Sequence, residues 1–118
     1  MFKGNYQSLK IWQRGMNLCR KIYKITNTFP KEEIYGLTSQ MRRSAISVPS
    51  NIAEGSRRIS DKEFGNFILI SRSSLAELET QTILAHDFSY INKTILDEEL
   101  KEIDELDKMI FSFHRSLK

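Results

Sequence analysis

Cysteine, proline and glycine are scarce in this chain of 118 residues, which contains one, two and five of them respectively. The single cysteine, Cys19, cannot form an internal disulfide, which excludes the disulfide-stapled class of small domains. No run of about 18 apolar residues occurs, so we expect no transmembrane helix. The first residues lack the apolar core of a signal peptide, and we therefore expect a cytoplasmic protein.

The residue patterns that enzymes use are also missing. Neither His86 nor His114 has a Glu or His at metal-ligand spacing, and no Glu-x-x-His of the di-iron type is present. The sequence has no phosphate-binding loop and no Gly-x-Gly-x-x-Gly fingerprint. Glu77 and Glu79 would diverge by about 200° on a helix, so they cannot share a site. We expect no enzymatic activity, no metal and no cofactor.

Apolar residues recur every three or four positions in four segments, which is typical of amphipathic helices. Pro30 separates the first two segments, and Ser60 with Glu63 forms a capping box before the third. Asp97 is the expected N-cap of the fourth. The predicted helices are residues 8–29, 31–54, 61–88 and 98–117.

The connections between these segments are short, which favours antiparallel neighbours. The sequence therefore predicts one all-α domain over residues 1–118, an antiparallel up-down-up-down four-helix bundle. The apolar stripe of the first segment includes Cys19, expected to be a small core residue, and Tyr23. The segment is apolar on more than one face, because Ile11, Leu18 and Ile25 widen this stripe. Part of such a wide arc is expected to pack against another subunit.

Charge is distributed unevenly although the whole chain carries only +3. Residues 1–60 contain 11 basic and 3 acidic side chains, a net charge of +8, whereas residues 61–118 contain 7 and 12, a net charge of −5. This asymmetry indicates either an anionic partner or head-to-tail self-association. The alternative is that both halves are ordinary solvated helix faces. The candidate nucleic-acid-binding residues are Arg14, Arg20, Lys21, Lys24, Arg42, Arg57 and Arg58.

A polar stripe runs along the second predicted helix beside its apolar face. We interpret it as structural, with its groups satisfied by other helices such as the one that carries Glu77. An open binding strip for phosphates or another protein is the alternative. The stripe residues are Gln40, Arg43, Ser44, Ser47, Asn51 and Glu54.

The stretch from Phe29 to Thr82 resembles the four-helix-bundle family of 23S rRNA intervening-sequence proteins. The resemblance rests on three short sequence motifs in this stretch: Gln40-Met41-Arg42-Arg43, Asn51-Ile52-Ala53-Glu54-Gly55 and Ser74-Leu75-Ala76-Glu77-Leu78-Glu79-Thr80. Ser73 stands where the family often has glycine. Relatives of the family include the accessory variability determinant of diversity-generating retroelements.

This resemblance implies an antiparallel bundle assembled as a homopentameric ring, without enzymatic activity. It also implies RNA or DNA binding through a basic surface and, in the retroelement branch, a reverse transcriptase as partner. Two functions follow for this chain. One is a nucleic-acid-binding module, and the other is an oligomeric scaffold that docks a protein partner such as a polymerase.

Overall fold

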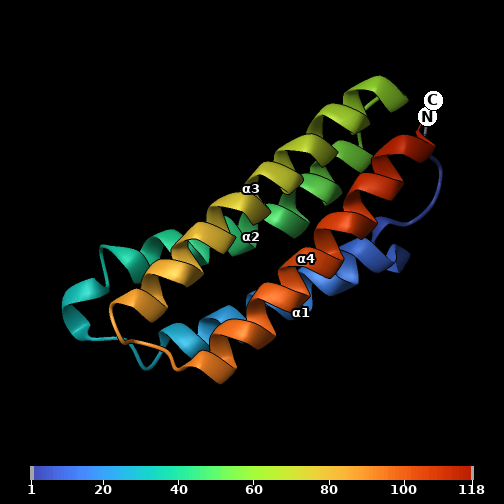
Figure 1. The fold of residues 1–118 in the computed structure, drawn as a ribbon. Helices are drawn as coiled ribbons and strands as arrows, with labels where there is room; N and C mark the ends of the chain where they lie inside the picture. Colours follow the sequence, from blue (N-terminus) through green and yellow to red (C-terminus); the bar gives the residue numbers. More distant parts are fainter. Residues whose placement is uncertain (1, 118) are drawn as a thin grey trace.

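The computed structural model describes residues 2–117, and over that range it contains helices and turns but no strand (Figure 1). Four long helices run back and forth in an elongated bundle with principal extents of 45 × 24 × 20 Å. Their bounds are α1 Lys10–Thr26, α2 Leu37–Ser56, α3 Asp61–Asp87 and α4 Lys93–Ser116. Two short 3₁₀ turns, η1 Tyr6–Ser8 and η2 Lys31–Glu33, precede α1 and α2. The prediction of an all-α four-helix fold is confirmed.

The helices pack in the order of the chain, with α2 between α1 and α3, and with α4 against both α3 and α1. Both chain ends lie at one end of the bundle, at the upper right of Figure 1. The opposite end holds the C-terminus of α1, the segment before α2, and the turn from α3 to α4. We call it the η2 end.

The second helix begins later than predicted, at Leu37 instead of residue 31. Gly36 has φ −114° and ψ −116°, a conformation outside the helical region, so it separates η2 from α2. The Glu33 carboxylate accepts a hydrogen bond of 3.1 Å from the Leu37 backbone N–H. It satisfies one of the free donors at the helix start, a role that sequence spacing did not reveal.

The fourth helix begins earlier than predicted, at Lys93 instead of residue 98. Its N-cap is Asn92, whose side-chain oxygen accepts a bond of 2.9 Å from the backbone N–H of Ile95. Asp97, the expected cap, lies inside the helix and pairs with Lys93 at 3.1 Å. The first helix is also shorter than predicted, because residues 6–8 form η1 and the helix ends at Thr26.

The start of α3 agrees with the sequence, since Ser60 Oγ accepts a bond of 3.2 Å from the Glu63 backbone N–H. Small residues then bring α3 close to α2. Ser71 Oγ donates to the Val48 carbonyl at 2.8 Å, and Ser74 Oγ donates to Ser47 Oγ at 2.9 Å. At Gly55, an added Cβ would lie 2.6 Å from Phe67 Cβ, so only glycine fits this approach.

One hydrophobic core fills the bundle, and all four helices contribute to it. Cys19 lies beside this core, and its Sγ donates to the Ala45 carbonyl at 2.9 Å. Burial raises the pKa of the Cys19 thiol to about 11, so the thiol stays protonated at neutral pH. Its position matches the packing role that the sequence indicated.

Candidate nucleic-acid interface

Arg42 is held in place between α1 and α2. Its Nε donates a bond of 2.9 Å to the Thr26 hydroxyl, in the last residue of α1. Its guanidinium carbon lies 4.4 Å from the centroid of the Tyr23 ring, a cation–π contact. The side chain is half-buried. These contacts fix the guanidinium at the surface without neutralising its charge, so it remains available to an anion.

Arg20 and Lys24 are exposed on α1, one turn apart. Helix α1 carries no acidic residue at all, and α2 carries only Glu54, near its far end. Arg20 bonds the neutral Asn17 side chain at 2.9 Å. Together with Arg42 they form a positive surface, and neither α1 nor the neighbouring part of α2 carries an acidic side chain. The local electrostatic potential is therefore positive and attracts phosphates.

Arg14 and Lys21 face α4 instead. Arg14 makes a bidentate pair with Glu102 at 3.0 and 3.1 Å, and Glu105 lies 3.9 Å away. The bond from Arg14 holds the pKa of the Glu102 carboxyl below its usual range. The basic and acidic halves of the sequence are therefore neighbours in space, and part of the +8 charge is neutralised within the chain.

A groove of about 230 Å³ follows this seam between α1 and α4. Lys21, Lys24, Glu98 and Glu99 are among its lining residues. Glu99 is only 4% exposed, and its Oε1 has no hydrogen-bond partner. Burial raises the pKa of the Glu99 carboxyl, and the charge of Lys21 opposes that shift. Lys21 thus lies close enough to the carboxylates of α4 for its charge to act on them, and Lys24 lines the same groove.

Arg57 and Arg58 lie at the opposite end of α2, about 22 Å along the helix from Arg42 at 1.5 Å per residue. Arg58 pairs with Glu54 at 3.3 Å, and its guanidinium covers the Phe67 ring at 4.6 Å. Arg57 lies over the Tyr6 ring at 5.8 Å. The structure does not bring these two arginines together with Arg20 and Arg42.

The polar stripe of α2 divides into two rows. Ser44 is buried, and Ser47 and Asn51 are half-buried and bonded to each other at the α2–α3 seam. Gln40, Arg43, Glu54 and Glu77 are exposed. Within residues 2–117, the side chains of Arg43 and Glu77 make no hydrogen bond or ion pair, so Glu77 does not satisfy the stripe within one chain.

Sequence reasoning therefore missed Arg43 and Tyr23 as members of this surface. Arg43 belongs to the stripe interpreted as structural, but its side chain is exposed, and it directly follows Arg42 in sequence. Tyr23 was counted among the apolar stripe of α1, yet 41% of it is exposed and it supports the Arg42 guanidinium. The complete absence of acids from α1 was the sequence signal that could have located the surface. We call Arg20, Lys24, Arg42 and Arg43 the basic face.

Other kinds of site find less support in the described part of the chain. No group of three or more His, Cys, Asp or Glu side chains within residues 2–117 could hold a metal ion. Over the same residues, no helix combines the length and apolar character needed to cross a bilayer.

Comparison with solved structures shows that the fold occurs in another protein. A solved structure from Bacteroides thetaiotaomicron, a protein with unknown function from the S23 ribosomal protein family, superposes with a TM-score of 0.83. The alignment covers 90% of this chain and 96% of that one at 20% identity, so the likeness concerns the fold. No curated protein matches the sequence. The pattern of the 23S rRNA-intervening sequence proteins matches residues 7–112. Since that match spans nearly the whole bundle, this chain belongs to the 23S rRNA-intervening sequence protein family.

Proposed function

We propose that this protein is a non-enzymatic module that binds nucleic acid through its basic face. The observation that carries the proposal is the position of Arg42, which Thr26 and Tyr23 fix between two helices without neutralising its charge. Arg20 and Lys24 on α1 and Arg43 on α2 extend the surface. Affinity would come from phosphate neutralisation and counterion release, so binding would tolerate different sequences and weaken steeply with salt.

Ion pairs with carboxylates make some of the candidate nucleic-acid-binding residues less available to a phosphate. Arg14 and Arg58 each face a carboxylate at 3.0 and 3.3 Å, so a phosphate would have to compete with that partner. Arg20 and Arg43 have no such competitor within residues 2–117. Both are also exposed, which makes them suitable for substitution without loss of the fold.

The test compares two double variants that carry the same net charge. Arg20→Ala with Arg43→Ala removes two charges from the basic face, and Lys62→Ala with Lys101→Ala removes two exposed charges from α3 and α4. We expect the first variant to lose affinity for structured RNA and to reduce the slope of log K against log salt by about two. The control should bind like the wild type. Equal loss in both variants, or no binding by the wild type at about 50 mM salt, would contradict the proposal.

A homopentameric ring is the assembly that we propose for the module, as the resemblance to the family implies. Large apolar side chains remain exposed along α3 and support further association; they are Leu69, Ile70, Ile83, Leu84 and Phe88. Light scattering after size exclusion checks this directly. The ring predicts five times the chain mass of 13.8 kDa, and a monomer would exclude it.

A scaffold that docks a protein such as a reverse transcriptase is the second candidate function. The same exposed apolar side chains of α3 favour it, because a nucleic acid would not cover them. Binding of a purified reverse transcriptase by the Arg20→Ala, Arg43→Ala variant, which lacks nucleic-acid affinity under the first proposal, separates the two functions. Retained binding supports the scaffold, and loss of binding argues that nucleic acid bridges the proteins.

A further inference from the structure

Tyr35 is the most exposed of the large hydrophobic side chains within residues 2–117, at 95%. It lies in the segment between η2 and α2, at the η2 end of the bundle. Its neighbour Ile34 is 52% exposed. A helical bundle of this size normally buries tyrosine rings at least in part, so a ring left almost wholly in water is available to a ligand.

The segment that carries Tyr35 is braced on both sides. The Glu33 carboxylate accepts from the Tyr90 hydroxyl at 2.7 Å and from the Leu37 backbone N–H at 3.1 Å. The Gly36 N–H also donates to the Glu33 carbonyl at 2.9 Å. An added Cβ at Gly36 would lie 2.7 Å from Glu33 Oε1, so glycine lets the chain close over this carboxylate.

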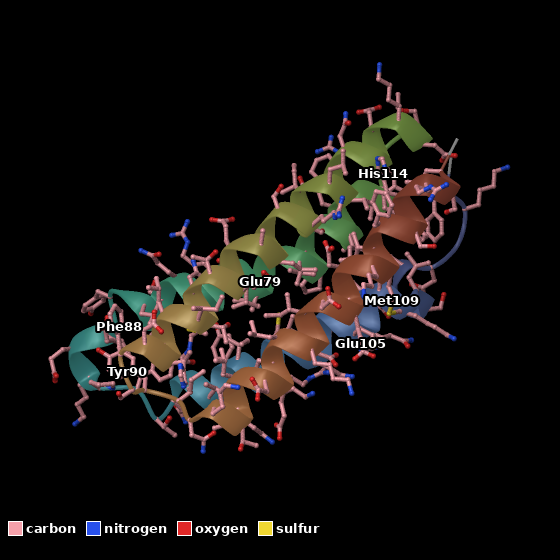
Figure 2. All side chains as sticks on the ribbon, viewed as in Figure 1. Glu79, Phe88, Tyr90, Glu105, Met109 and His114 are labelled. Atoms are coloured by element: carbon pink, nitrogen blue, oxygen red, sulfur yellow. The ribbon has the colours of Figure 1, made fainter. Side chains whose placement is uncertain are left out.

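The Tyr90 ring anchors that brace in the bundle. It packs against Phe29 with ring centroids 5.2 Å apart and against Phe88 at 5.8 Å. Figure 2 shows Phe88 and Tyr90 together at the η2 end. Tyr35 is therefore presented by a backbone that is fixed before any ligand arrives, which lowers the entropy cost of binding.

The basic face reaches the same end. Arg42 lies five residues after Leu37, about 8 Å along the axis of α2, and bonds Thr26 at the end of α1. This axial distance, from the start of α2 to Arg42, corresponds to two or three nucleotide steps of a stacked strand, at about 3.4 Å each. Lys31 in η2 adds an exposed cation, whereas Glu32 is an exposed acid beside it. Residues 31–36 contain one basic and two acidic side chains, a net charge of −1, so phosphates are favoured at Arg42 over this segment.

A flat, exposed aromatic ring at the same end of the bundle as a cationic surface is an arrangement suited to the recognition of an unpaired base. We propose that Tyr35 is a stacking platform for an unpaired base whose neighbouring phosphates lie on the basic face. The nucleic acid is then single-stranded or looped RNA or DNA, because a duplex keeps its base faces inside its own stack. This inference rests on the proposed function and names the class of nucleic acid.

The experiment measures fluorescence anisotropy of labelled oligonucleotides at about 50 mM salt. The probes are an unstructured RNA, a DNA of the same sequence, and the duplex formed by the RNA with its complement. The variants are Tyr35→Ala, Tyr35→Phe and, as a neighbouring apolar control, Ile34→Ala. Both positions are exposed, and circular dichroism confirms that each variant remains helical.

We expect Tyr35→Ala to weaken binding of the unpaired probes about tenfold, while Tyr35→Phe and Ile34→Ala bind like the wild type. Duplex binding should be the same for all four proteins, and comparison of the RNA and DNA arms shows whether the sugar contributes. Unchanged binding by Tyr35→Ala overturns the inference, and so does equal loss for unpaired and duplex probes. A change of oligomeric mass in Tyr35→Ala would instead assign Tyr35 to a contact between proteins.

The outcome separates this inference from the proposed function. If Tyr35→Ala binds normally while the Arg20→Ala, Arg43→Ala variant does not, nucleic-acid binding by the basic face is supported and base stacking on Tyr35 is wrong. If the wild type binds none of the probes, both proposals are wrong.

Discussion

The hydroxyl of Tyr90 donates a hydrogen bond of 2.7 Å to Oε2 of Glu33, which joins the segment before α2 to the turn after α3. These residues are 57 positions apart in sequence. The bond therefore connects two loops that the short connectors of the bundle do not otherwise link. It also determines how the Tyr35 segment is held.

Removal of this bond should loosen the η2 end, and the effect should depend on pH. Bonds from Tyr90 and Leu37 lower the pKa of the Glu33 carboxyl in the folded state. The stabilisation is present above the unfolded pKa of about 4.3 and is lost as pH falls through the folded pKa. We expect Glu33→Gln to lower the thermal midpoint at pH 7, with a difference from the wild type that shrinks in acid. A difference that is constant with pH would contradict this assignment.

The contribution of Glu99 to stability should depend on pH in the opposite direction. Burial raises its pKa in the folded state, so stability falls as pH rises from the unfolded pKa of about 4.3 to the higher folded value. Glu99→Leu should therefore raise the free energy of unfolding at pH 7 by about 1–3 kcal/mol, the cost of a buried polar group without a partner. Urea unfolding at pH 4 and pH 7 checks this. The gain should be smaller at pH 4, where most of the carboxyl is protonated in both states.

Arg14→Ala should separate stability from binding. The Arg14–Glu102 pair is partly buried, with side-chain exposures of 33% and 16%, so its loss should cost about 1 kcal/mol after allowance for solvent screening. Nucleic-acid affinity should stay close to that of the wild type, because Glu102 already neutralises this arginine. A loss of affinity as large as that of Arg20→Ala would show that Arg14 also binds nucleic acid, and would contradict this assignment.

Gly55→Ala should be destabilising although Gly55 lies inside a helix. The added methyl would lie 2.6 Å from Phe67 Cβ and 2.9 Å from Phe64 Cδ1, so α2 and α3 would have to separate. We expect a loss of about 1–3 kcal/mol in the free energy of unfolding. Gly65→Ala is the control, because its Cβ would make only ordinary van der Waals contacts, with the His114 ring at 3.4 Å and with Leu117 Cδ1 at 3.9 Å. That variant should gain up to about 1 kcal/mol from the smaller backbone entropy of alanine.

The helices that the sequence located best are those whose signals are local. Ser60 and Glu63 cap α3 within four residues of chain, and the structure shows the bond between them. The start of α2 was missed because its cap comes from Glu33, which turns back across Gly36. The start of α4 was missed because Asn92 and Asp97 are both acceptable caps, and only the path of the chain after α3 decides between them.

The amino-acid sequence by itself determined the four amphipathic helices, the packing role of Cys19 and the excess of positive charge in the first half, because periodicity and composition are properties of neighbouring residues. Only the tertiary structure decided which cations are free. Arg14 and Arg20 look alike along α1, yet α4 brings Glu102 to one and nothing to the other. Pairing of charges over 88 positions depends on which helices become neighbours, and no local pattern encodes that.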